Sequence, residues 1–189
     1  MLHHYVPRHF ILLISFLIIP YFSLFAQINK ISSNPPYFWF NGGLGFSTLG
    51  LAYGFNVNLF LNKSLISARY LYNDELKESS FFRKYPPESQ WELGLLYGRY
   101  IRSNIFMVTF SAGISMTGGT RRGNYIKNEY FMRIYEEKHA SGEFGFPIES
   151  QIMYTPFSFI GIGFNVFANL NKHESIGGIL ANIELGHFR

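Results

Sequence analysis

Residues 105–116, IFMVTFSAGISM, alternate strictly between apolar and small or polar side chains. The even positions from 106 to 116 are Phe, Val, Phe, Ala, Ile and Met, and the odd positions from 109 to 115 are Thr, Ser, Gly and Ser. Because successive side chains of a β-strand point to opposite faces, this pattern predicts a strand with one apolar face. That face must be covered either by a protein core or by lipid.

The same alternation recurs along most of the chain. It is found over residues 37–47, 49–61, 64–73, 91–101, 105–116, 142–154, 157–170 and 177–188. Each segment has about the length at which a tilted strand crosses a membrane. Pro147 lies within the sixth segment, and we expect a bulge there because proline cannot donate to the ladder. The pattern therefore predicts an all-β fold of eight strands.

The connections between these segments differ in length in a regular way. Tight turns are expected at residues 62–63, 103–104 and 155–156, and short links near Ser47 and Lys172. Long polar loops are expected at residues 74–90 and 118–141. When the strands are numbered in order, all the tight turns fall on one rim and both long loops on the other. This asymmetry is typical of outer-membrane β-barrels.

The composition decides which face meets the interior. Only 15% of the residues are charged, whereas 19% are aromatic, and a soluble surface normally carries about 25–35% charged residues. The small, polar face of the strands has too few charges to be such a surface. It suits the narrow bore of an eight-stranded barrel, which side chains fill. We therefore predict a closed antiparallel eight-stranded transmembrane β-barrel whose apolar face meets lipid.

The N-terminus has the layout of a secretory signal peptide. Arg8 precedes an apolar run from Phe10 to Ile19, and processing is expected after Ala26. A retained membrane anchor is the alternative, but Pro20 ends the run short of the roughly 20 residues that a spanning helix needs. The expected organisation is a signal peptide at 1–26, a short periplasmic segment at 27–36 and the barrel domain at 37–189.

The chain resembles the small eight-stranded outer-membrane β-barrel proteins, over roughly residues 37–188. The resemblance rests on the strand pattern and the loop asymmetry. It implies export to the cell outer membrane, with outer-membrane lipid and lipopolysaccharide as surroundings. It also implies a structural, attachment or partner-binding role, and more rarely a lipid-modifying activity.

Several classes of function are disfavoured by the residues themselves. There is no cysteine, and the net charge of +4 is not gathered into a basic run, so neither a thiolate site nor a nucleic-acid partner is expected. The histidines are scattered, and we expect no metal site and no cofactor.

Four charged residues share the polar face of their strands and should project into the bore: Arg69, Glu92, Glu149 and Glu184. One interpretation is a proton relay or an ion path. The other is a packed plug of paired charges, since each alone would be costly in a low-dielectric interior. We favour the plug, because an eight-stranded bore is normally filled. Arg99 has the lipid-facing parity near the tight-turn rim, where it can reach the headgroups.

An enzymatic alternative rests on His173 and Ser175. A His-x-Ser pair on a barrel strand resembles the outer-membrane lipid A 3-O-deacylases, in which the serine is the nucleophile and the histidine its base. The family's next residue, asparagine, is Ile176 here. Glu184 has the wrong parity and lies roughly 30 Å along the strand from Ser175. The non-enzymatic interpretation is therefore favoured.

The segment 118–141 is longer than closing two strands requires, and such loops are usually functional or disordered. It mixes basic and aromatic residues near the level of lipopolysaccharide phosphates. A candidate binding surface for a protein or glycan comprises Arg121, Arg122, Phe131, Arg133 and Tyr135. We favour a plainer interpretation, in which the fifth and sixth strands continue as a protruding hairpin with a solvated surface of mixed charge.

Overall fold

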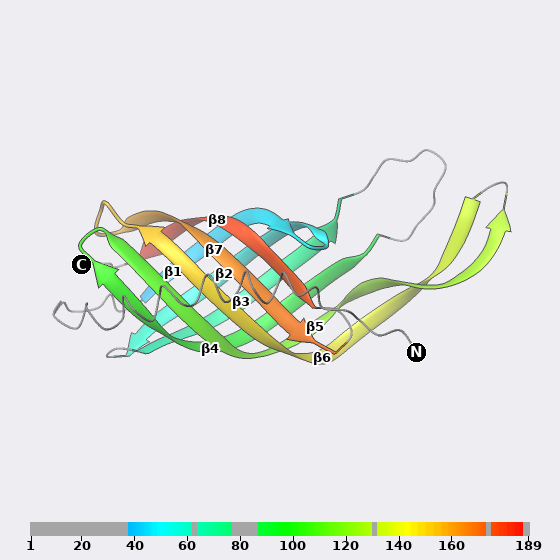
Figure 1. The fold of residues 1–189 in the computed structure, drawn as a ribbon, viewed down its shortest axis with the longest axis horizontal. Helices are drawn as coiled ribbons and strands as arrows, with labels where there is room; N and C mark the ends of the chain where they lie inside the picture. The colour runs from blue at the N-terminus through cyan, green and yellow to red at the C-terminus, as the bar shows by residue number, and fades with distance from the viewer. Residues whose placement is uncertain (1–37, 62–63, 77–86, 130–131, 173–174, 187–189) are drawn as a thin grey trace, which may run out of the picture. The chain divides into compact units, whose positions relative to one another are not determined.

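The computed structural model describes residues 38–61, 64–76, 87–129, 132–172 and 175–186. Eight strands form a closed barrel in which each strand is antiparallel to its two neighbours in the sequence and β1 pairs with β8 (Figure 1). The strands are β1 (Phe38–Ser47), β2 (Gly50–Leu61), β3 (Ser64–Glu75), β4 (Ser89–Ser103), β5 (Phe106–Glu129), β6 (Met132–Tyr154), β7 (Ile160–Asn171) and β8 (Ile176–Gly186). The predicted fold is confirmed.

The described residues all belong to one compact unit. The predicted signal peptide and the periplasmic segment at 27–36 lie outside the described residues. Over the ranges that are described, no helix is long and apolar enough to cross a membrane.

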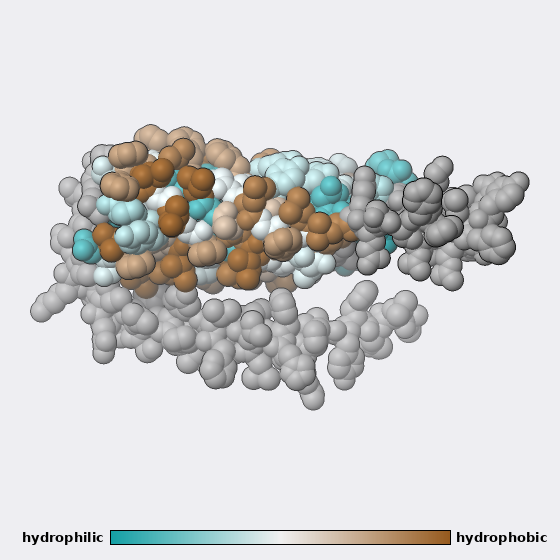
Figure 2. Space-filling view, turned by 90° about the horizontal axis from the view of Figure 1, so that it is seen from above, coloured by the Kyte–Doolittle hydropathy of each residue, from teal (hydrophilic) through white to brown (hydrophobic). Residues whose placement is uncertain are grey.

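The two faces of each strand differ in exposure as the alternation predicts, with apolar side chains outside and buried side chains in the bore. On β7, for example, Phe164 is 64% exposed on the outside, whereas its neighbour Asn165 is 2% exposed in the bore. Apolar residues are spread over the outer surface of the barrel in Figure 2. A surface that exposes so many large apolar side chains is stable in lipid, not in water.

Aromatic residues on this outer surface lie at both rims and also between them. Those at the strand ends near the tight turns are Phe38, Phe40, Phe106, Tyr154, Phe157 and Phe159. Those near the other rim include Phe46, Tyr53, Tyr72 and Phe144, and the Tyr53 and Tyr72 rings stack with centroids 5.0 Å apart. Between the rims, exposed Phe55, Tyr97, Phe110 and Phe164 lie among leucine, isoleucine and valine. Apolar side chains therefore cover the outer surface from rim to rim, as they do on transmembrane barrels.

The connections follow the predicted asymmetry, with one change. The links at 62–63, 104–105 and 155–159 share one rim, and those at 76–88 and 130–131 lie at the other. Asn104 has a φ of 46°, a left-handed value that asparagine tolerates well and that suits a tight turn. The link expected at 155–156 is longer, because β7 begins at Ile160 and not at Phe157.

Of the two interpretations of residues 118–141, the structure bears out the favoured one, the protruding hairpin: β5 continues to Glu129 and β6 starts at Met132. The bulge expected at Pro147 is wrong. Pro147 produces no register shift: its pairing with Asn169 on β7 is regular, and only two rungs toward β5 are missing. The bulge in this region lies between Thr117 and Gly119, opposite Gly142, whose φ is 76°. Proline has no backbone N–H to donate to the ladder, and the missing pairs between β6 and β5 lie at its level.

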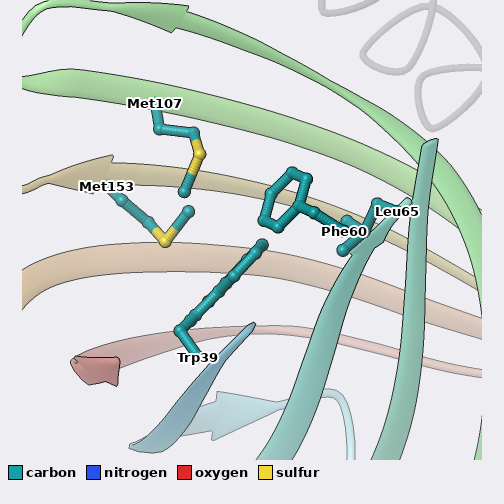
Figure 3. Close-up of a cluster of buried hydrophobic side chains, with 5 residues drawn as sticks. All are labelled: Trp39, Phe60, Leu65, Met107 and Met153. Carbon is teal, nitrogen blue, oxygen red and sulfur yellow. The ribbon is translucent and has the colours of Figure 1, made fainter. Parts of the chain in front are cut away.

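Apolar side chains also fill the bore, although the inward face of the strands was expected to be small and polar. One cluster, here called the turn-side cluster, lies toward the tight-turn rim and is shown in Figure 3: Trp39, Phe60, Leu65, Met107 and Met153. The Trp39 and Phe60 rings stack with centroids 4.4 Å apart. A second, here called the loop-side cluster, lies toward the other rim and comprises Ala52, Leu71, Phe167, Ile176 and Leu180. A polar layer separates the two clusters.

Candidate functional sites: the bore and the external ribbon

The polar layer of the bore is organised around Arg69 on β3. Its guanidinium donates to Glu92 Oε1 from both Nε (3.0 Å) and Nη2 (2.5 Å). Its Nη1 donates to Glu149 Oε2 at 3.0 Å, and Asn56 Nδ2 donates to Glu149 Oε1 at 2.8 Å. All four side chains are buried. The arginine therefore joins β4 and β6 across the bore through two charge-assisted contacts.

Glu184 lies in the same bore but is not one of the partners of Arg69. Its Oε1 accepts a hydrogen bond from Gln151 Nε2, and its backbone pairs with Asn41 on β1. The structure thus brings three of the four inward-facing charges together and places the fourth among amide side chains. The Arg69 guanidinium carbon also lies 5.9 Å from the centroid of the Phe167 ring, at the edge of the loop-side cluster.

This arrangement fills the bore at three levels. Trp39 is fully buried in the turn-side cluster, Arg69 is 1% exposed in the polar layer, and Leu71 is 1% exposed in the loop-side cluster. Packed, paired side chains of this kind hold strands together across the barrel.

The second candidate site is the part of β5 and β6 that extends beyond the other strands (Figure 1). The pairing of β4 with β5 ends at Thr120, and that of β6 with β7 begins at Gly145. Residues 121–129 of β5 therefore pair only with β6, and residues 132–144 of β6 pair only with β5. These two ranges are here called the ribbon. At about 3.4 Å per residue, nine residues of β5 correspond to about 30 Å along the strand.

The basic side chains at the base of the ribbon are engaged by carboxylates. Arg121 Nη2 lies 3.0 Å from Glu143 Oε2 on the paired strand. Arg122 forms an ion pair with Glu75, the last residue of β3. Farther along β6, Lys138 Nζ lies 3.7 Å from Glu136 Oε2. The described part of the ribbon is therefore a surface of paired charges rather than a basic patch.

Only part of the predicted loop surface can be located. Arg121 and Arg122 lie at the base of the ribbon. Arg133 and Tyr135 belong to β6, where the backbone alone is described, and Phe131 lies outside the described residues.

The residues of the enzymatic alternative are only partly described. Ser175 is exposed next to the start of β8, and its hydroxyl donates to the Asn171 carbonyl at 3.4 Å. His173 lies outside the described residues. Glu184 is buried in the bore toward the other end of β8, about 30 Å from Ser175 along the strand. Among the described side chains, no three His, Cys, Asp or Glu residues are grouped so that they could hold a metal ion.

No protein-family model matches the chain, and no curated protein matches it. Several solved structures are similar to it. Neisserial surface protein A superposes with a TM-score of 0.58 at 9% identity, covering 82% of this chain and 99% of that one. Ail, the attachment invasion locus protein of Yersinia pestis, gives 0.54 at 9% identity, covering 80% and 99%. The N-terminal β-barrel domain of Pseudomonas aeruginosa OprF gives 0.53 at 10% identity, covering 80% and 98%. The chain therefore has the fold of the small eight-stranded outer-membrane β-barrels.

Proposed function

We propose that the barrel is a non-enzymatic anchor in the cell outer membrane, and that the external ribbon binds a partner protein or a surface glycan. The observation that carries this proposal is the extension of β5 and β6, which are 24 and 23 residues long, beyond strands of 10–15 residues. A two-stranded ribbon adds little stability in water. Because the ribbon contributes little to the stability of the barrel, its length favours a role outside the barrel.

The chemistry of the ribbon favours recognition along its length over binding of a single small ligand. Both of its edges lack a neighbouring strand among the described residues, so backbone groups are available for an added strand. The charges on the described part occur as pairs of opposite sign, which disfavours a polyanion as the main ligand. Ail, one of the proteins with a similar barrel, is an attachment protein by name, and the same class of role is proposed here.

The filled bore supports an anchor rather than a channel. Two apolar clusters enclose the layer that contains Arg69, so a hydrated ion would have to displace packed side chains at two levels. The separation of Ser175 from Glu184 supports a non-enzymatic role over the lipid A deacylase alternative, because a catalytic triad is defined by its geometry.

Deleting residues 124–138 should leave the barrel folded and abolish partner binding. The pairs that close the barrel, up to Thr120 on β5 and from Gly145 on β6, lie outside the deleted segment. Folding is measured by heat-modifiable migration on a gel and by insertion into lipid vesicles, and binding by recovery of the copurifying partner. A Gly-Ser replacement of the same length serves as the control for shortening. Undiminished recovery of the same partner from either variant would exclude the ribbon as the binding site.

Localisation has a separate test at the N-terminus. Mass spectrometry of protein extracted from outer membranes should find a chain that begins at or next to Gln27, since the short apolar run before it has the layout of a cleaved signal. A chain that retains Met1 in the outer-membrane fraction would contradict the signal-peptide assignment.

A further inference from the structure

We infer that Arg122 fixes the direction of the ribbon relative to the barrel. It does so by joining the base of the ribbon to both ends of the segment between β3 and β4. The set of contacts among Arg122, Glu75 and Glu88 is here called the lock. The inference concerns the conformation of the ribbon and does not depend on what the ribbon binds.

The ribbon needs such a lock because its own connection to the barrel is irregular. The register shifts between Thr117 and Gly119, at the level where the ribbon leaves its neighbours, and twice more between Arg122 and Lys127. A bulge bends the strand and disrupts the ladder locally. Gly142, opposite the first shift, has a φ of 76°, which glycine adopts without strain. Backbone pairing alone therefore leaves a bend at the base.

The contacts of Arg122 connect the ribbon, on one side of this bend, with the barrel strands on the other side. Its guanidinium Nη2 donates to both carboxylate oxygens of Glu75, at the end of β3. Its backbone N–H donates to Glu88 Oε1 at 3.2 Å, immediately before β4. Glu75 and Glu88 are joined in turn, because Glu75 N donates to the Glu88 carbonyl at 2.9 Å and Glu88 N donates to Glu75 Oε2 at 3.2 Å. The three residues form a closed set that links β3, β4 and β5.

The neighbouring ion pair provides a natural contrast. Arg121 pairs with Glu143, and both residues belong to the ribbon. That pair joins the two ribbon strands to each other. The Arg122 and Glu75 side chains are 30% and 26% exposed, so dissolved salt can screen their attraction. The lock should therefore loosen as ionic strength rises.

The test is a distance measurement between the ribbon and the barrel. The chain contains no cysteine, so N124C and K172C introduce two unique labelling sites, both at exposed positions. Spin labels at these sites in lipid nanodiscs report the distance distribution by pulsed electron resonance. We expect one narrow peak for the labelled parent, loss of that peak in R122Q and in E75Q, and no further change in R122Q/E75Q, because the two residues act as one unit. R121Q is the matched control and should retain the narrow peak.

The salt dependence of the labelled parent is a second measurement that requires no substitution at the lock. Raising NaCl from about 0.1 M to about 1 M shortens the screening length from about 10 Å to about 3 Å and should broaden the peak reversibly. A peak that stays equally narrow in R122Q and at high salt would overturn the inference, as would a broad distribution in the parent. Equal broadening in R121Q and R122Q would also overturn it, since any lost charge would then have the same effect.

Discussion

Replacing Arg69 with methionine is expected to lower the free energy of unfolding by about 3–5 kcal/mol. The substitution leaves the Glu92 and Glu149 carboxylates buried in the bore without the guanidinium that contacts both of them. Removing one partner from a buried charged set is costly because the remaining charges stay desolvated. The measurement is urea-dependent unfolding in lipid vesicles or detergent micelles.

Two variants serve as controls for the Arg69 result. R69M/E92Q/E149Q removes all three charges and should recover part of the loss, since no uncompensated carboxylate of this set remains. R121M breaks a partly exposed ion pair at the base of the ribbon and should change stability by about 1 kcal/mol or less. If R69M unfolds within about 1 kcal/mol of the parent, the charged layer does not hold the barrel together.

Arginine at Val166 is expected to destabilise the inserted barrel by about 2–4 kcal/mol, because this side chain faces outward near the middle of β7 and would meet the centre of the bilayer. Phe159→Arg is the matched control. Phe159 is also exposed but lies next to the start of β7 at the tight-turn rim, where the penalty falls to about 0–1 kcal/mol. Both are measured by refolding into vesicles.

Two outcomes would contradict the lipid-facing assignment. One is an equal effect of V166R and F159R, which would mean that depth in a bilayer does not decide the penalty. The other is refolding of the parent to the same state without lipid or detergent. An inward substitution such as Gly163→Arg is not a suitable control, because a Cβ at this position already lies 2.6 Å from the Ile152 carbonyl.

The division between outside and inside follows from the sequence alone. A strand alternates its side chains with a period of two, so once Phe164 is outward Asn165 is inward, whatever the rest of the chain does. The eight segments and the inward parity of Arg69, Glu92, Glu149 and Glu184 follow in the same way. The apolar residues inside the bore share this parity, as Trp39 and Phe60 show. The alternation therefore places these apolar residues on the inward face, but small and polar residues outnumber them there.

The length of the ribbon and the choice of ion-pair partners depend on the tertiary structure. Residues 118–141 lack regular alternation, so the sequence leaves a loop surface and a protruding hairpin both open. Residues 118–129 and 132–141 are strands because β5 and β6 pair with each other beyond the barrel. Parity places the inward carboxylates on one face, but only closure of the barrel determines which of them lie beside Arg69. Glu149 is 80 residues away in the sequence and contacts the guanidinium, whereas Glu184 bonds to Gln151 instead. The alternation is a local property of each strand, whereas the position around and along the bore is set by the register of all eight strands together.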